Sequence, residues 1–299
     1  MGKQINERKI TIDWPIMRRQ GETLLSGLNV IMRDMELLAL AVLLTMPITK
    51  STPQWPGTVG DYHGFVMHSF KVDGCDCNVV EPKSVGKGNH WIWRMEFFDH
   101  RPMADLALLE KGYFLTYMNV GNTFGAPSAI DHLDKFYSEM TRTYKLNRKV
   151  VLEGFSRGGL YAYNFAVRDP RRVAAIYGDA PVCDFTSWPG GNGKGPGSKD
   201  DWTSLIKTYG FKDEAEALAY RHNPINELAT LAKAHIPILH VIGSADEVVP
   251  VSENTDLVEE RYKKLGGTIE VIRKPGGLHH PHSLDDPTPI VEFVLKHQR

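Results

Sequence analysis

The chain has 299 residues, which suffices for one large α/β domain with a buried core or for two small domains. Hydrophobic residues make up 42% and charged residues 24%, as in ordinary soluble globular proteins, and the formal net charge of -1 leaves no basic excess that would indicate nucleic acid. The odd count of 3 cysteines argues against a disulfide framework.

The first feature along the chain is an apolar run at residues 37–48 (LLALAVLLTMPI). It is too short to span a bilayer comfortably, but it fits the hydrophobic region of a signal peptide, with Arg33 just before it. The mostly polar residues that precede the run are not typical of a signal peptide. We expect residues 1–56 to be an N-terminal extension and the protein to be secreted or periplasmic. The alternatives are an uncleaved anchor, which would give membrane contact, and a cytoplasmic protein whose N-terminal helix packs on the domain.

A hairpin opens the globular part of the sequence, with strands predicted at 65–72 and 77–80 and the turn Asp73-Gly74 between them. Strands and helices then alternate, which predicts a mostly parallel sheet flanked by helices, with an antiparallel start. The strands predicted after the hairpin span residues 90–97, 113–120, 149–153, 173–178, 236–242 and 268–273. The predicted helices span residues 102–111, 130–144, 159–168, 253–265 and 290–297.

The strongest motif is the segment Gly154-Phe155-Ser156-Arg157-Gly158, a G-x-S-x-G pattern between a short apolar strand and a helix. In this setting a sharp turn exposes the serine hydroxyl at the carboxyl edge of the sheet, and the helix N-terminus favours negative charge that develops on a substrate. A Gly-rich turn with an incidental serine is the alternative. We predict that Ser156 is a catalytic nucleophile.

A serine nucleophile needs a base, and the base needs an acid that orients it. Asp246 comes shortly after the apolar strand predicted at 236–242, so its carboxylate can reach the same sheet edge as Ser156. An Asx turn or a helix cap is the alternative role for Asp246, and Glu247 is the alternative acid.

Three histidines follow the last predicted strand, after the Gly-rich turn at residues 275–278. We favour His279 as the base, and we expect His280 and His282 to line the site or to cap the following helix. Three nearby histidines also suggest a metal site. They share one short segment, however, and no carboxylate cluster is obvious near it in the sequence, so we expect neither a metal nor another cofactor.

Two arginines are candidates for the oxyanion hole. The backbone N–H of Arg157, the residue after the nucleophile, is the first expected donor, and a second is expected from the loop around residues 93–95. The side chains of Arg157 and Arg94 would add charge near the substrate. A structural ion pair of Arg157 with Glu153 or Glu96 is the alternative.

The segment between the strands expected to carry Ser156 and Asp246 holds aromatic residues among many glycines. Aromatic faces beside polar groups suit sugar rings, so we predict substrate contacts from Trp188 and Asp184. We also predict one from Trp93, in the loop around residues 93–95 that is expected to supply the second oxyanion donor (the oxyanion loop). Trp188 fits an anchor for a flexible loop equally well.

With Ser156, Asp246 and His279 in this chain order, residues 60–299 resemble the α/β-hydrolase superfamily. The segments LEGFSRGGLYAYNFA, DAPVCDFTSWPGG and HHPHSL are similar to bacterial members linked to polysaccharide breakdown, among them esterases that remove acetyl or methyl ester groups from carbohydrates. The Ser-Arg pair also resembles glucuronoyl esterases, whose arginine after the nucleophile assists at the oxyanion, although the acid here lies at the more usual position. The resemblance implies an α/β-hydrolase catalytic domain at 57–299, with a short loop-rich cap insertion at about 183–223.

We therefore expect a serine esterase that acts on a small-molecule or polysaccharide ester through an acyl-enzyme, with no nucleic-acid partner. A serine peptidase of the same fold is one alternative, because its chemistry is nearly identical. A non-catalytic binding module on this fold is another, although such modules usually lose a member of the triad.

Overall fold

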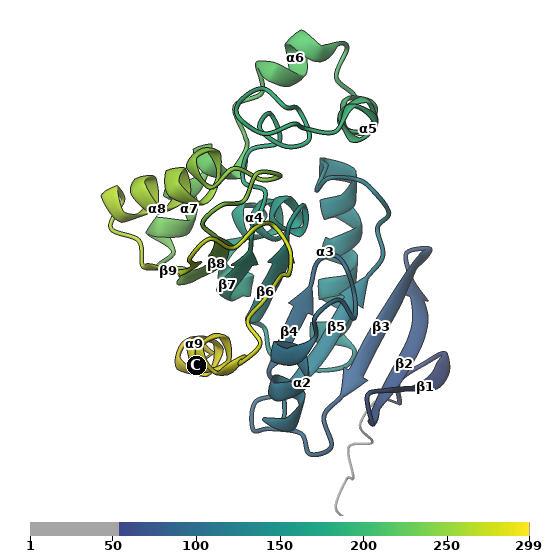
Figure 1. The fold of residues 1–299 in the computed structure, drawn as a ribbon. Helices are drawn as coiled ribbons and strands as arrows, with labels where there is room; N and C mark the ends of the chain where they lie inside the picture. Colours follow the sequence, from purple (N-terminus) through teal and green to yellow (C-terminus); the bar gives the residue numbers. More distant parts are fainter. Residues whose placement is uncertain (1–53, 299) are drawn as a thin grey trace, which may run out of the picture. The chain divides into compact units, whose positions relative to one another are not determined.

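A nine-stranded mixed sheet runs through residues 54–298, the part of the chain that the computed structural model describes. The strands are Thr58–Tyr62 (β1), Phe65–Val72 (β2), Cys75–Glu81 (β3), Trp91–Arg94 (β4), Phe114–Met118 (β5), Val150–Phe155 (β6), Val173–Asp179 (β7), Ile238–Gly243 (β8) and Ile269–Lys274 (β9). Their order in the sheet is β1-β2-β3-β5-β4-β6-β7-β8-β9 (Figure 1). The pairs β1–β2, β2–β3 and β3–β5 are antiparallel, and the pairs β5–β4, β4–β6, β6–β7, β7–β8 and β8–β9 are parallel. This arrangement confirms the predicted fold class.

Helices cover both faces of this sheet. They are Met103–Glu110 (α2), Pro127–Arg142 (α3), Gly158–Arg168 (α4), Lys199–Tyr209 (α5), Glu214–Leu218 (α6), Leu228–Lys233 (α7), Thr255–Lys264 (α8) and Thr288–His297 (α9), with short 3₁₀ turns at Pro170–Arg172, Pro224–Asn226 and Val251–Glu253. Apolar side chains of α3, α4, α7 and α8 join one core cluster with the sheet, and those of α2 and α9 join the other. Two cores on opposite faces are what a strand-helix alternation requires.

Residues 183–223 contain two helices that are absent from the prediction, α5 and α6, which lie at the top of Figure 1. Helix α5 starts after Ser198, whose hydroxyl accepts a hydrogen bond from the N–H of Asp201, and it stops at Gly210, whose φ is 76°. Strand β1 and helix α7 are also absent from the prediction.

The strands β6, β7 and β8, which lead to the site residues, are buried along their whole length. Strands covered on both faces form nearly continuous apolar runs, and their few polar members need partners. His240 of β8 lies between the hydroxyl of Tyr163, at 2.8 Å, and that of Thr255, at 3.0 Å. Burial lowers the pKa of His240 to about 3, so this ring is a neutral, structural member of the core.

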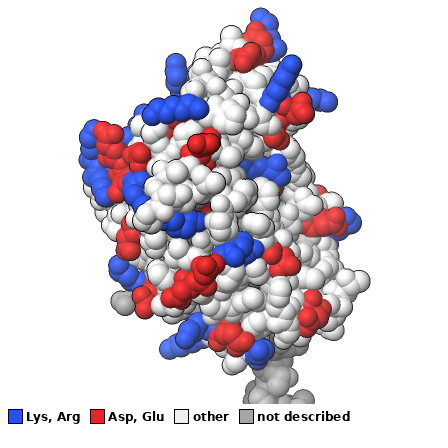
Figure 2. Space-filling model, in the orientation of Figure 1, with Lys and Arg blue, Asp and Glu red and all other residues white. Residues whose placement is uncertain are grey.

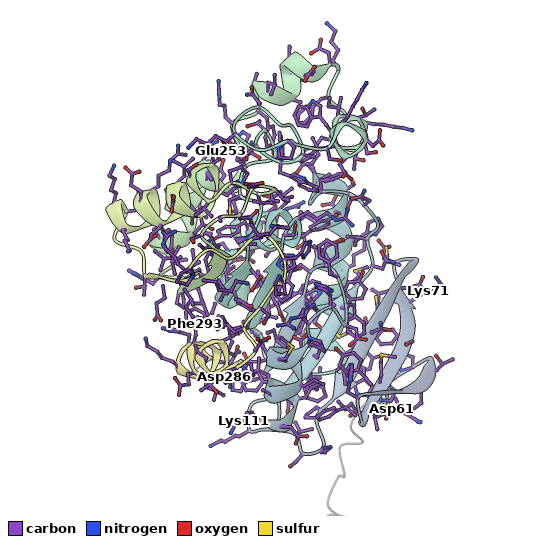
Figure 3. All side chains as sticks on the ribbon, viewed as in Figure 1. Asp61, Lys71, Lys111, Glu253, Asp286 and Phe293 are labelled. Atoms are coloured by element: carbon purple, nitrogen blue, oxygen red, sulfur yellow. The ribbon has the colours of Figure 1, made fainter. Side chains whose placement is uncertain are left out.

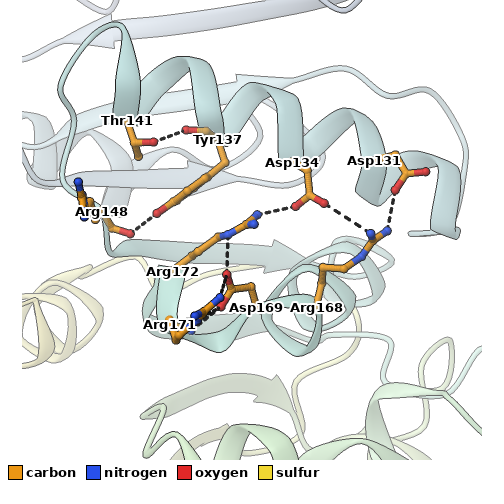
Figure 4. A network of polar contacts seen from close by, with 9 residues as sticks. All are labelled: Asp131, Asp134, Tyr137, Thr141, Arg148, Arg168, Asp169, Arg171 and Arg172. Atoms are coloured by element: carbon orange, nitrogen blue, oxygen red, sulfur yellow. Dashed lines mark hydrogen bonds and ion pairs between the residues drawn. The ribbon is translucent and has the colours of Figure 1, made fainter.

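Ion pairs join α3 to the end of α4 on the surface (Figure 4). Arg168 contacts Asp131 at 2.7 Å and Asp134 at 3.6 Å, and Arg172 contacts Asp134 at 2.6 Å. Because these side chains are partly exposed, each pair contributes about 1 kcal/mol or less. The buried apolar contacts of the two helices therefore dominate their attachment.

Glu253, labelled in Figure 3, fixes the Gly-rich loop of the insertion. Its carboxylate accepts hydrogen bonds from the Ser187 hydroxyl and from the N–H of Lys194, both at 2.6 Å. The next residue, Asn254, accepts a hydrogen bond from the N–H of Asp184 at 3.1 Å. The insertion is thus tied to the segment that begins α8.

Positive and negative side chains are interspersed over the face in Figure 2. On α8, for example, Lys263 pairs with Glu259 at 2.6 Å and Lys264 pairs with Glu260 at 2.5 Å. Within residues 54–298, no helix has the length and apolar character needed to cross a membrane. The apolar run at 37–48, with the signal peptide predicted there, lies outside the described residues.

Candidate active site

Ser156 lies at the sharp turn between β6 and α4. Its φ of 49° falls in the left-handed region that residues other than glycine rarely adopt. Its N–H donates to the carbonyl of Asp179 at the end of β7, at 2.8 Å, and its carbonyl accepts from the N–H groups of Gly159 at 3.0 Å and Val182 at 2.8 Å. These three bonds hold the strained residue at the carboxyl edge of the sheet.

Two glycines allow the close packing that this turn requires. A Cβ atom on Gly154 would lie 2.7 Å from the carbonyl oxygen of Gly158, and one on Gly159 would lie 2.7 Å from the carbonyl oxygen of Val182. Real Cβ atoms do not approach other atoms this closely, so α4 can start directly against β6 only because both positions are glycine.

His279 brings its ring to the hydroxyl of Ser156. Its Nε2 lies 3.0 Å from Ser156 Oγ, and its Nδ1 lies 2.7 Å from Asp246 Oδ2. The other oxygen of Asp246 accepts from the N–H groups of Val248 at 3.0 Å and Val249 at 2.9 Å. A carboxylate held in this way keeps the proton on Nδ1 and turns the lone pair of Nε2 toward the hydroxyl. The structure thus brings the three predicted residues together in one buried chain of hydrogen bonds.

The other two histidines of the segment do not contact Ser156 in this way. His280 is exposed, and its ring lies 4.9 Å from that of His279. His282 is buried, and its Nδ1 lies 2.8 Å from Asp179 Oδ1. This second Asp-His pair is absent from the sequence prediction. The alternative acid, Glu247, is exposed, whereas Asp246 is buried against the ring.

Comparisons with known proteins identify the architecture. No family model matches the chain, and no curated protein matches it. Among solved structures, dipeptidyl peptidase 4 of Porphyromonas gingivalis superposes with a TM-score of 0.60 at 14% identity over 79% of this chain and 36% of its own. A candidate lipase of Acinetobacter baumannii gives 0.53 at 14% identity over 79% and 92%, and a bacterial membrane phospholipase A gives 0.51 at 15% identity over 95% and 98%. The chain has the α/β-hydrolase fold.

The loop after β4 occupies the place from which the α/β-hydrolase fold supplies its second oxyanion donor. The N–H of Met95 donates to the carbonyl of Glu153 at 2.9 Å, so it belongs to the sheet. Beyond it, Glu96 lies against the nucleophile turn, since a Cβ atom on Gly158 would be 3.7 Å from the nitrogen of Glu96. The candidate donors are therefore Glu96 and its neighbour Phe97, one or two residues later than predicted.

The prediction that Arg94 serves the oxyanion is wrong, because its side chain is buried beneath the loop. The guanidinium forms ion pairs with Asp105 and with Glu153, the latter at 3.2 Å, and donates to the carbonyls of Phe97 at 3.1 Å and His100 at 2.5 Å. Burial alone would lower the pKa of Arg94, but attraction to the two carboxylates raises it. Burial raises the pKa of Glu153 well above its ordinary value, and the neighbouring Asp105 raises it further.

The side chain of Arg157 is held by the loop after β4. Its Nε donates to Glu96 Oε2 at 2.9 Å, and its guanidinium lies 5.1 Å from the ring centre of Phe97. This ion pair with Glu96 is the structural role predicted above as the alternative for Arg157. Burial raises the pKa of Glu96, and the charge of Arg157 opposes that shift. The pair joins the nucleophile turn to the oxyanion loop.

Of the predicted substrate contacts, that of Trp93 is wrong. Its side chain is 0% exposed, and its ring lies 5.0 Å from those of Phe136 and Phe165 in the core. Asp184 closes a local turn, since its carboxylate accepts from the N–H of Thr186 at 2.9 Å. Trp188 is half-buried and packs against the core, which agrees with a loop anchor. A contact of His280 with substrate stays a prediction.

Proposed function

We propose that this chain is a serine hydrolase that cleaves carboxylic esters. The observation that carries the proposal is the chain of contacts from Ser156 Oγ to His279 Nε2, at 3.0 Å, and from His279 Nδ1 to Asp246 Oδ2, at 2.7 Å. It comprises a nucleophile, a base and an orienting acid in the order and geometry that acyl transfer requires.

The proposed reaction has two halves. In the first, His279 takes the proton of Ser156 as Oγ attacks the ester carbonyl, and it then gives that proton to the departing alcohol. In the second, a water molecule attacks the acyl-enzyme with the same ring as base, and the carboxylic acid leaves. Asp246 keeps its hydrogen bond to His279 Nδ1 and stabilises the imidazolium that forms in each half.

The oxyanion of each tetrahedral intermediate is assigned to backbone donors at the nucleophile turn. The N–H of Arg157 lies at the start of α4, where the helix dipole favours negative charge. The second donor comes from the segment Glu96-Phe97, which the Arg157–Glu96 pair and Arg94 hold in place.

We propose esterified carbohydrates, carrying acetyl or methyl ester groups, as the substrate class. The support is the resemblance of the three sequence segments to bacterial carbohydrate esterases. Peptidases among the structural neighbours support amide cleavage as the second candidate, because the same triad serves both reactions.

The first test is turnover of p-nitrophenyl acetate by the purified full chain. Ser156→Ala should lower kcat by about 10³-fold or more, because the nucleophile is lost. Ser204→Ala, at an exposed position on α5, is the matched control and should keep the wild-type rate. Labelling by a fluorophosphonate probe should also depend on Ser156. Retained activity in pure Ser156→Ala would overturn the proposal.

The second test separates the substrate classes. The full chain is supplied in parallel with acetylated polysaccharide, methyl-esterified polysaccharide and aminoacyl amides, and the release of acetate, methanol or amine is measured. Release of acetate or methanol well above that of amine supports the carbohydrate esterase. Preferential cleavage of the amides would favour the peptidase.

A further inference from the structure

The proposed base lies on the loop between β9 and α9 (Figure 1). A cluster of imidazoles surrounds it. His279, His280 and His282 each place one ring nitrogen within 4.8 Å of the other two. The three rings lie 4.7 to 4.9 Å apart, edge to face, and His100 extends the cluster at 5.7 Å from His282. Ester hydrolysis requires only one of these rings as a base, so it does not explain why the others converge on that base.

The surroundings of two of the rings are those of metal ligands. His279 directs Nδ1 to Asp246 at 2.7 Å, and His282 directs Nδ1 to Asp179 at 2.8 Å. A histidine that binds a metal almost always donates its other N–H to such a carboxylate, which fixes the tautomer and strengthens the free nitrogen as a ligand. Both rings therefore keep Nε2 for a ligand bond. The sequence conceals this arrangement, because the two carboxylates follow different strands.

The charge of the site and the exposure of one ring fit a divalent cation. Asp179 and Asp246 are buried and supply negative charge directly behind the ligand rings. A tetrahedral Zn²⁺ ion with Zn–N bonds of about 2.0 Å brings its ligand nitrogens to about 3.3 Å from one another, so the cluster has to contract. His280 is exposed and its side chain can supply that movement. Imidazole nitrogens suit Zn²⁺ better than they suit Mg²⁺ or Ca²⁺.

We propose that Zn²⁺ binds across His279, His280 and His282 and inhibits the enzyme, an inference whose inhibitory part rests on the proposed function. The ion takes the lone pair of His279 Nε2, which otherwise accepts the proton of Ser156 Oγ at 3.0 Å. With that lone pair engaged, the hydroxyl loses its base. No bond to the substrate is made or broken by the ion, and its removal restores the resting contacts.

Binding is tested independently of catalysis on the metal-free full chain carrying Ser156→Ala. Zn²⁺ is titrated by calorimetry, and Co²⁺ is added as a spectroscopic probe whose visible absorption reports tetrahedral imidazole ligation. We expect one equivalent of Zn²⁺ to bind. His280→Ala should raise the Kd tenfold or more, and Asp179→Asn, which removes a partner behind His282, should raise it by about 10- to 100-fold. His132→Ala, on α3 and paired with Asp73, is the matched control and should leave the Kd unchanged.

Inhibition is tested on the wild-type serine with p-nitrophenyl acetate. Zn²⁺ should lower the rate and a chelator should restore it, and in His280→Ala the inhibiting concentration should rise tenfold or more when each protein is compared with its own zinc-free rate. Absence of stoichiometric binding, a Kd unaffected by His280→Ala, or a rate that Zn²⁺ increases would overturn the inference. A chain that binds Zn²⁺ through these residues but hydrolyses no ester would support the site and overturn the proposed function instead.

Discussion

Replacing Arg94 by methionine should destabilise the protein more than any surface change of similar size. Arg94 is 1% exposed and faces the carboxylates of Asp105 and Glu153, which are 0% and 1% exposed. Methionine fills a similar volume but leaves these two carboxyl groups without a cation. It also removes the guanidinium hydrogen bonds to the carbonyls of Phe97 and His100, so the oxyanion loop loses its anchor.

The size of the effect follows from the burial of the pair. Removing one partner of a buried ion pair costs about 3–5 kcal/mol, because the remaining charge stays desolvated. In a domain of this size each kcal/mol lowers Tm by about 2–4 °C, so Arg94→Met should lower Tm on the order of 10 °C. Arg168→Met is the matched control. Its side chain is 42% exposed in the α3–α4 ion pairs, so the loss should be about 1 kcal/mol or less.

Urea and thermal denaturation of the two variants give the comparison directly. A third protein, Arg94→Met with Asp105→Asn and Glu153→Gln, removes the unpaired charges as well and should recover most of the lost stability. The reasoning fails if Arg94→Met costs no more than Arg168→Met. It also fails if the triple variant is as unstable as the single one, since uncompensated charge would then not be the cause.

Three further predictions concern the site and its support. Asp246→Asn should lower kcat for p-nitrophenyl acetate by about 10³- to 10⁴-fold with the fold intact by circular dichroism, because the His279 tautomer is no longer fixed; a near wild-type rate would contradict this. Gly159→Ala should lower the free energy of unfolding in urea by about 1–3 kcal/mol, because its Cβ would lie 2.7 Å from the carbonyl oxygen of Val182; an unchanged midpoint would count against that contact. The raised pKa of Glu153 means that the folded state binds more protons than the unfolded state, so wild-type stability falls as pH rises above the ordinary value of 4.5. Glu153→Gln should therefore gain stability relative to the wild type as the pH is raised from 4.5 towards neutrality, and a constant difference would refute the shift.

The order of the elements could be predicted because the central strands carry their own signal. Strands β6, β7 and β8 are short apolar runs, since helices cover them on both faces. Gly154 and Gly159 flank Ser156 because a Cβ atom at either position would clash with neighbouring backbone, and Gly154 already belongs to the recognisable G-x-S-x-G motif. Strand β1 was not predictable in the same way, because it is an exposed edge strand with little apolar pattern. Helix α5 did have signals in the sequence, a serine cap at its start and a glycine at its end, but the preceding Gly-rich loop masked them.

Depth in the fold was harder to predict than position along the chain. Trp93 and Arg94 lie next to each other on β4, and both are buried: Trp93 packs in the core, and Arg94 lies beneath the loop that follows β4. Alternation along a strand shows which residues share a face of the sheet, but it does not show whether a helix or a loop covers that face and buries them. The pairing of Arg157 with Glu96 needed a contact between segments 61 residues apart, which no local pattern encodes.

The choice among the three histidines shows what the sheet adds to the motif. Strands β7 and β8 are parallel neighbours, so Asp179, the last residue of β7, and Asp246, which follows β8, meet at one edge. The loop after β9 crosses that edge and gives one histidine to each acid. The carbonyl of Asp179 is bonded to the N–H of Ser156, which places the His282 pair beside the backbone of the nucleophile turn, whereas Asp246 directs His279 to the hydroxyl. The same strand order that brings His279, the proposed base, to Ser156 therefore leaves a second imidazole, His282, held by a carboxylate beside it, and this second ring is the physical ground for the proposed ligand.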